Sequence, residues 1–195
     1  MKLIDTFEIL KGVLYSIIYD APAYGGAHEF QRLINQWNDR EYLIDYFDRN
    51  KEKLQTPFWN EVINGNPHSN VGIMQAVDFT IEEVSEFEKE ILELANGKGG
   101  KNLEEIFKPL HKEFRKESEK SEFKAYGIYE TSWLRFYAIK IEENFYFITG
   151  GGIKLTKRME DSECLDLELQ KLKKVYDYLF QNPDINPDLL EKLEG

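Results

Sequence analysis

The chain has 195 residues with 42% hydrophobic side chains, including 13 Phe, 11 Tyr and 3 Trp, and a formal net charge of −11. This apolar content is sufficient for a packed core and excludes wholesale disorder, while the longest apolar runs are too short to cross a bilayer. The single cysteine, Cys164, excludes an intramolecular disulfide framework, and Asp5 interrupts the N-terminal run where a signal peptide would extend its apolar core. We therefore expect a cytoplasmic protein.

The N-terminal region contains two runs with β-like composition, 3–10 and 13–19. Lys11-Gly12 lies between them and supplies the kind of tight turn that joins the two strands of a hairpin. A single helix starting near Asp5 is the alternative, because short apolar runs do not distinguish a helix from a strand.

Helical spacing follows, because four apolar side chains fall on one face of a helix: Phe30, Leu33, Ile34 and Trp37. Asn38-Asp39 offers the N-cap of a second helix, and Thr56-Pro57 is predicted to end that helix. Residues 58–69 are predicted to be irregular, with a dense turn signal at 64–67.

The strongest helix is predicted over 70–96, before the glycine-rich run 97–100. One side of this helix carries apolar residues. We interpret the glutamates of the other side as a solvated acidic face: Glu82, Glu83, Glu86, Glu90 and Glu93.

The hydrophobic period changes from 3.6 to 2 after Phe123, which predicts strands. The first strand is expected over 133–141, where five alternate side chains share one face: Trp133, Arg135, Tyr137, Ile139 and Ile141. Glu142-Glu143-Asn144 predicts a hairpin loop, since Asn tolerates the left-handed conformation. The return strand begins at Phe145, and Gly150-Gly151-Gly152 is expected to break it or to form a bulge. A closing helix is predicted from Asp161 or Ser162 to Asn182.

Two motif-like features lack the residues that their chemistry needs. Gly99-Gly100-Lys101 resembles the end of a phosphate-binding loop, but no Ser or Thr follows the Lys, so a helix end is the better interpretation. The three histidines, at positions 28, 68 and 111, have no metal-ligand spacing. The sequence therefore predicts no metal and no cofactor.

Charge is unevenly distributed along the chain. Residues 124–158 carry a net charge of +3, although the whole chain carries −11. The overall acidity argues against free nucleic acid as a simple electrostatic partner, because such binding depends on Lys and Arg. The segment 124–158 nevertheless predicts a local basic face on an acidic body.

The run from Ser132 to Arg158 resembles the RelE/HigB-like toxin superfamily of bacterial type II toxin–antitoxin systems, in particular its phage-associated HigB branch. That family shares an Arg-bearing aromatic strand, a polar hairpin, an apolar strand entering a small-residue turn, a Lys-rich piece and a final helix. Lys108-Pro109-Leu110 is also similar to the short motif that the family has ahead of its sheet. The resemblance covers about residues 108–180, although this chain is longer and more acidic than family members.

The resemblance implies an α+β fold, in which a small twisted antiparallel sheet is packed against N-terminal helices and a C-terminal helix, as in RelE. We expect a single domain over 1–195. Within it, residues 1–107 form an N-terminal hairpin and a helical elaboration, 108–180 form the RelE-like sheet and closing helix, and 181–195 form a tail.

Members of the family cleave RNA, often mRNA on the ribosome, with the 2′-hydroxyl of the RNA as nucleophile and without a metal. The resemblance implies a catalytic set in this chain: Arg135, Tyr137, Lys154, Lys157 and Arg158. Arg and Lys would stabilise phosphate charge, and Tyr137 would transfer a proton. The residue pattern by itself favours Tyr137 as a packing residue at the edge of the core and is compatible with Lys154 pointing to solvent.

The leading functional prediction is a toxin, or a derivative of one, that is a metal-independent endoribonuclease. Its expected partners are an antitoxin protein and mRNA on the ribosome, with no DNA and no membrane. The alternative is a non-enzymatic module that keeps the toxin-like fold and binds a protein partner through an acidic surface. This alternative predicts basic residues that point apart and an exposed apolar patch around Phe58-Trp59. A small-molecule enzyme, the third option, would need a deep pocket.

Overall fold

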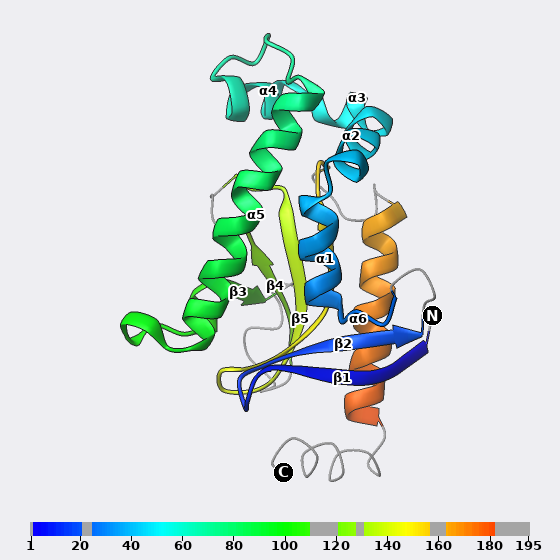
Figure 1. Ribbon diagram of the computed structural model, residues 1–195, viewed down its shortest axis with the longest axis vertical. Coiled ribbons are helices and arrows are strands. Elements are labelled where there is room, and N and C mark those ends of the chain that lie inside the picture. The colour runs from blue at the N-terminus through cyan, green and yellow to red at the C-terminus, as the bar shows by residue number, and fades with distance from the viewer. Residues whose placement is uncertain (1, 21–24, 110–120, 128–130, 157–162, 182–195) are drawn as a thin grey trace.

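The computed structural model describes residues 2–20, 25–109, 121–127, 131–156 and 163–181, which form a six-stranded sheet with helices packed against it (Figure 1). The predicted α+β class is therefore confirmed. The strands are β1 (Lys2–Leu10), β2 (Leu14–Asp20), β3 (Phe107–Pro109), β4 (Ser121–Tyr126), β5 (Leu134–Glu142) and β6 (Phe145–Ile153). The helices are α1 (Glu29–Asn38), α2 (Arg40–Arg49), α3 (Lys51–Leu54), α4 (Pro57–Asn64), α5 (Ile73–Ala95) and α6 (Glu163–Gln181), with short 3₁₀ turns η2 (Lys98–Gly100) and η3 (Leu103–Glu105).

The sheet has the strand order β1-β2-β6-β5-β4-β3 and is mixed, whereas the sequence predicted an antiparallel one. The exception is the pair β2–β6, which is parallel over Leu14–Tyr146, Tyr15–Phe147 and Ser16–Ile148. Parallel strands need a long crossover connection, and residues 29–105 with their helices lie between these two strands in the chain. The N-terminal hairpin and the strands of the C-terminal half thus belong to one sheet.

Both predicted hairpins are present. β1 pairs with β2 in antiparallel register, and Gly12 takes a left-handed φ of 69° in the turn, a conformation that glycine adopts without steric cost. Asn144 has a φ of 57° in the turn between β5 and β6, as the sequence predicted.

The glycine run of β6 does not end the strand, which continues through Gly150-Gly151-Gly152 to Ile153. A register shift occurs instead, because Tyr137 pairs with Gly150 while Ala138 pairs with Ile148. Thr149 is the extra residue, so the predicted bulge lies just before the glycines.

The first predicted helix is confirmed as α1, whereas the second is divided at Asn50 into α2 and α3. Asp39 caps α2 by accepting from the backbone N–H groups of Glu41 and Tyr42. The prediction that 58–69 is irregular is wrong, because α4 occupies its first half. Thr56-Pro57 ends one helix and also starts the next. Thr56 is the N-cap of α4, with its hydroxyl accepting from the N–H of Trp59, and Pro57 takes the first helical position, where its missing N–H costs nothing.

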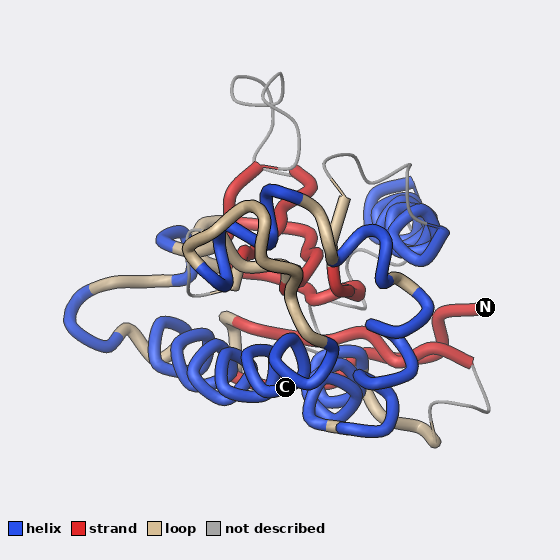
Figure 2. Tube along the Cα trace, turned by 90° about the horizontal axis from the view of Figure 1, so that it is seen from above, coloured by secondary structure: helices blue, strands red, loops and turns tan. Residues whose placement is uncertain are grey.

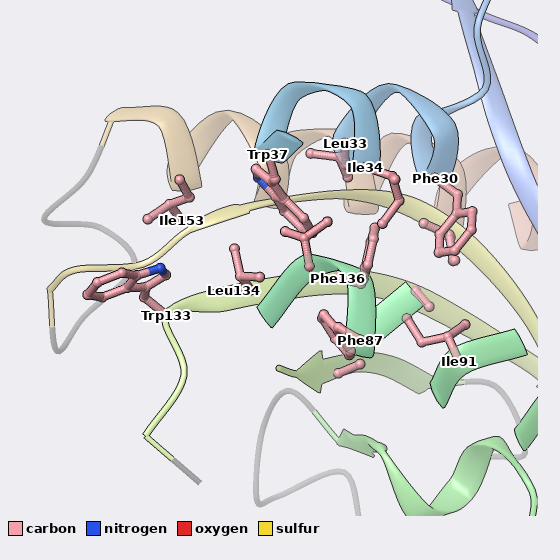
Figure 3. Packing of buried hydrophobic residues seen from close by; sticks show 14 of the residues in the cluster. Phe30, Leu33, Ile34, Trp37, Phe87, Ile91, Trp133, Leu134, Phe136 and Ile153 are labelled. Carbon is pink, nitrogen blue, oxygen red and sulfur yellow. The ribbon is translucent and has the colours of Figure 1, made fainter. Parts of the chain in front are cut away.

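One face of the sheet packs against α1, α2, α4 and α5 through a large apolar cluster. Figure 3 shows Phe136 of β5 between side chains of α1 and α5, with ring centroids 4.9 Å from Trp37 and 5.3 Å from Phe87. Leu134 and Ala138 of β5 lie on the same side as Phe136.

The other face packs against α6. Its smaller cluster joins Tyr137 and Ile139 of β5 to Leu172, Val175 and Leu179 of α6. Figure 2 shows the strands running between helices on both sides. None of the described helices is long and apolar enough to span a membrane.

The long helix α5 lies within the predicted range, but its acidic side is not wholly solvated. Glu83 is 0% exposed, so its assignment to a solvated face is wrong. It lies on the side of α5 that faces Gly127 and Ser132, since a Cβ on Gly127 would be 1.9 Å from Glu83 Oε1. Helical spacing places Glu83 in the buried stripe, three residues after Thr80 and four before Phe87, so its charge and not its position led to the wrong assignment.

Candidate functional site at the ends of β5 and β6

Arg135 and Lys154 line one cavity of about 220 Å³ at the start of β5 and the end of β6. We call it the Arg135–Lys154 cavity. Aromatic, hydroxyl and apolar side chains complete its wall: Phe58, Trp59, Thr131, Ser132, Leu155 and Thr156. Two of the five residues predicted for the catalytic set are therefore brought together.

Three hydrogen bonds, with α2, with α4 and with Trp133 before β5, fix the backbone around Lys154. The Tyr46 hydroxyl of α2 donates to the carbonyl of Ile153 at 2.8 Å. The N–H of Lys154 donates to the carbonyl of Trp133 at 2.7 Å. The indole Nε1 of Trp59 donates to the carbonyl of Leu155 at 2.8 Å. Lys154 therefore extends from a backbone whose position is determined on both sides.

An aromatic cluster around Trp133 lies next to residues 153–155. The Trp133 ring lies 5.2 Å from Trp59, 5.3 Å from Phe47 and 5.1 Å from Phe79, and its Nε1 donates to the Thr80 hydroxyl at 3.1 Å. Trp133 was predicted to share a strand face with Arg135. It belongs instead to the opposite cluster, because it precedes β5 and does not follow the strand alternation.

Arg135 is only 9% exposed and lies on the α6 side of β5, with its Nη1 donating to the carbonyl of Leu134. Ser132 accepts a hydrogen bond from the N–H of Leu134 at 2.9 Å and so fixes the start of the strand. Arginine in such a position holds a charge within a largely desolvated wall, where its interaction with an anion is stronger than in water.

Of the other three predicted catalytic residues, Tyr137 is the one that lies within the described ranges. Tyr137 lies on the same strand face as Arg135 but is fully buried beneath α6 with Ile139 and Leu172. A side chain so placed does not reach a bound polymer. Lys157 and Arg158 lie outside the described residues, directly after Thr156 of the cavity wall.

A second, larger cavity of about 740 Å³ adjoins the first. Both are lined by Phe58, Trp59, Leu155 and Thr156, and the second also by Glu52, Lys53, Thr56 and Pro57. The Phe58 side chain is 54% exposed, the largest exposure among the described large hydrophobic residues. The apolar surface that the sequence predicted around Phe58 is thus present at the mouth of the cation-lined cavity, while Trp59 is buried.

Four charged side chains form a second constellation where β2 and β6 separate: Glu29, Arg32, Glu168 and Lys171. Lys171 Nζ is 2.7 Å from Glu168 Oε1 and 3.2 Å from Glu29 Oε2. Arg32 Nε is 2.9 Å from Glu29 Oε1. We call this group the ionic cluster. It joins α1 to α6, and Lys171 and both carboxylates are buried.

The glycine run of β6 makes room for this cluster. A Cβ on Gly150 would be 1.9 Å from Glu168 Oε2, and that oxygen accepts the N–H of Gly151 at 3.0 Å. Burial raises the pKa of the Glu168 carboxyl, although the Lys171 charge opposes the shift. Burial lowers the pKa of Lys171, but the charges of Glu168 and Glu29 outweigh that effect and raise it. Lys171 and both carboxylates are buried, Arg32 is partly exposed, and the charges are balanced, so we assign the cluster a structural role in holding α6.

Sequence reasoning missed the ionic cluster, yet one signal was present. Glu168 occupies a position in the helical series with Leu172, Val175 and Leu179, so a charge lies in the apolar stripe of α6. The sequence did not show that Glu29 and Arg32, more than a hundred residues earlier, provide the partners.

No group of three or more His, Cys, Asp or Glu among the described residues is arranged to hold a metal ion. Comparison of the chain with protein-family models, with curated proteins and with solved structures finds no match. Two cations and three hydroxyl groups around one cavity can bind and polarise an anionic oxygen such as that of a phosphate.

Proposed function

We propose that this chain is an RNA-directed endoribonuclease of the toxin type, which works without a metal and holds the scissile phosphate in the Arg135–Lys154 cavity. The observation that carries the proposal is the meeting of Arg135 and Lys154 in one concave wall, although Arg135 belongs to β5 and Lys154 directly follows β6. Arg135 is 9% exposed and Lys154 is partly buried, and cations in a partly desolvated wall attract an anionic oxygen more strongly than cations in water.

The chemistry needs no group beyond the RNA and the protein. The 2′-hydroxyl of the RNA loses its proton as its oxygen bonds to the adjacent phosphorus, the bond from phosphorus to the 5′-oxygen breaks, and the 5′-oxygen receives a proton, so that no net proton is gained or lost. The products are a 2′,3′-cyclic phosphate and a 5′-hydroxyl. Negative charge builds on the phosphate oxygens during this step, and fixed cations stabilise it because they require no reorganisation. The cell compartment of such an enzyme is the cytoplasm, with ribosome-bound mRNA as substrate and an antitoxin protein as its inhibitor.

Induced expression in a bacterial host tests the proposal. Wild type would be compared with Arg135→Gln/Lys154→Gln, which removes both charges and keeps a polar side chain at each position. The control is Lys89→Gln/Lys98→Gln, which removes two charges from α5 and the turn after it. Circular dichroism would verify the fold of each variant. We expect arrest of growth and of protein synthesis by wild type and by the α5 control, and normal growth with the Arg135 and Lys154 variant.

Mapping of RNA ends identifies the reaction. We expect new 5′-hydroxyl ends in mRNA within minutes of induction. We also expect the purified protein to cleave RNA that is not bound to a ribosome, and this cleavage to persist when a metal chelator is present. Normal growth with abundant folded wild-type protein and unchanged RNA ends would contradict the proposal.

The second candidate is a protein-interaction module, and the observation that favours it is the exposed Phe58 beside the cavity of about 740 Å³. It predicts that wild type leaves RNA intact and that a co-expressed partner protein is lost from the complex on Phe58→Ala but not on Phe7→Ala. The two candidates therefore differ in the RNA-end measurement.

A further inference from the structure

We propose that Phe58 is a stacking platform for one base of a single-stranded RNA whose neighbouring phosphate lies in the Arg135–Lys154 cavity. This inference rests on the proposed function and adds to it the strandedness of the substrate and a specific contact with a base.

The ring of Phe58 is exposed and held in place. It is 54% exposed, yet its centroid lies 4.8 Å from that of buried Trp59 at an interplanar angle of 72°. Trp59 is itself fixed by its hydrogen bond to Leu155, and Thr56 with Pro57 fixes the first turn of α4. An aromatic face positioned in this way loses little conformational freedom when a base stacks on it.

The same ring lines the wall that carries the cations. Phe58 belongs to the cavity with Arg135 and Lys154, and also to the adjoining cavity that reaches Lys53. A nucleotide combines a flat apolar base with an anionic phosphate, and this surface offers the complement of each part side by side. An apolar peptide would contact Phe58 but has no anionic group to place beside the cations of the wall, whereas a nucleotide supplies both contacts.

The arrangement selects a single strand over a duplex. Bases within a duplex are stacked on each other and present only their edges, whereas an unpaired base exposes the face that Phe58 could cover. Stacking on one aromatic ring discriminates weakly among bases, so the contact supplies affinity and register more than sequence specificity.

Phe7 is a natural control for this inference. It is also an exposed phenylalanine, at 46%, but it lies on edge strand β1 and stacks on His28 at 4.2 Å. It does not line the Arg135–Lys154 cavity. Substitution of Phe7 therefore removes a similar ring without touching the proposed platform.

The experiment measures binding without cleavage. Fluorescence anisotropy would follow a short labelled RNA in which 2′-O-methyl groups replace every 2′-hydroxyl, so that no nucleophile remains. The proteins are wild type, Phe58→Ala, Phe58→Trp, Phe7→Ala and Arg135→Gln/Lys154→Gln. A matched series of oligonucleotides carries a single abasic position, which lies at a different site in each oligonucleotide. We expect Phe58→Ala to weaken binding roughly tenfold, with Phe58→Trp and Phe7→Ala close to wild type.

The abasic series provides the sharper readout. One abasic position should weaken binding to wild type and leave binding to Phe58→Ala unchanged, because the lost stacking is the same contact. Equal binding by Phe58→Ala and wild type, or an equal abasic effect in both, would overturn the platform while the charge variant and the growth assay still test the nuclease. Absence of any binding by wild type, with normal growth, would overturn the nuclease and the platform together.

Discussion

The two faces of the sheet are covered in different ways. The face beneath α1, α2, α4 and α5 is packed by apolar side chains, with Phe136 at the centre of an aromatic group. The face beneath α6 has a smaller apolar cluster and, at its margin, the ionic cluster. Apolar burial stabilises without fixing orientation, whereas hydrogen-bonded charges are satisfied only in one register. We infer that α5 contributes mainly stability and that the charges of α6 determine where that helix docks.

The largest expected effect is on the apolar face. Phe136→Ala removes a fully buried ring that contacts Phe30, Trp37 and Phe87, and should lower the free energy of unfolding by about 4 kcal/mol. Urea unfolding followed by circular dichroism measures it. The control is Ile44→Ala, an exposed residue of α2 that should change little. A loss below about 1 kcal/mol for Phe136→Ala would show that this face is not the main source of stability.

The next effect concerns the ionic cluster. Lys171→Met leaves the buried carboxylates of Glu29 and Glu168 with only Arg32 as a nearby cation, and should cost about 3 kcal/mol. The double variant Lys171→Met/Glu168→Gln removes one charge of each sign and should regain a large part of that loss in the same unfolding experiment. If the two substitutions are simply additive, the charges do not act as a unit and the contrast between the faces fails.

A smaller effect is expected from the glycine that admits Glu168. Gly150→Ala places a methyl group 1.9 Å from the present position of Glu168 Oε2, so the carboxylate must move, at a cost of about 2 kcal/mol. Gly72→Ala is the matched control, because its nearest neighbour is Gln75 Cβ at 3.9 Å and its φ is negative. Equal stability of both variants would mean that the ionic cluster adapts to the lost space.

The smallest effect is a pH dependence at the start of α1. Burial lowers the pKa of His28, whose Nδ1 accepts from the N–H of Gln31 at 3.4 Å as the helix N-cap. The unfolded chain therefore takes up a proton more readily, so stability is complete above about pH 6.5 and decreases as the pH falls below it. His28→Asn keeps a capping side chain without this titration. Thermal unfolding between pH 5 and 7.5, as an approximate range, should show a steeper decline for wild type than for the variant.

Local patterns accounted for most of the elements. The hairpin at Gly12, the cap at Asp39, the long helix α5 and the left-handed Asn144 each depend on residues close in sequence, and each is where the pattern placed it. The segment after Thr56 was missed because Pro was interpreted only as a stop, although it also suits the first position of a helix.

The candidate site was less accessible to sequence reasoning because long-range contacts create it. Arg135 and Lys154 were chosen from a resemblance, but Phe58, Ser132 and Thr131 join them only once α4 packs beside the end of β6. Burial also separated residues that strand alternation had grouped, since Tyr137 lies beneath α6 while Arg135 reaches the cavity. Spacing identifies the face of a strand, but not which part of that face another element covers.

The parallel pair β2–β6 has a consequence for how the chain reaches its fold. Residues 14–16 pair with residues 146–148, so this contact has a very large sequence separation. Contacts of this kind slow folding, because a long loop must close before they form. During translation the N-terminal hairpin leaves the ribosome long before β6 is made, so the edge of β2 that pairs with β6 has no partner strand during that time. The nascent chain thus exposes an aggregation-prone strand edge until β6 arrives, and a fragment ending before β5 would expose it permanently.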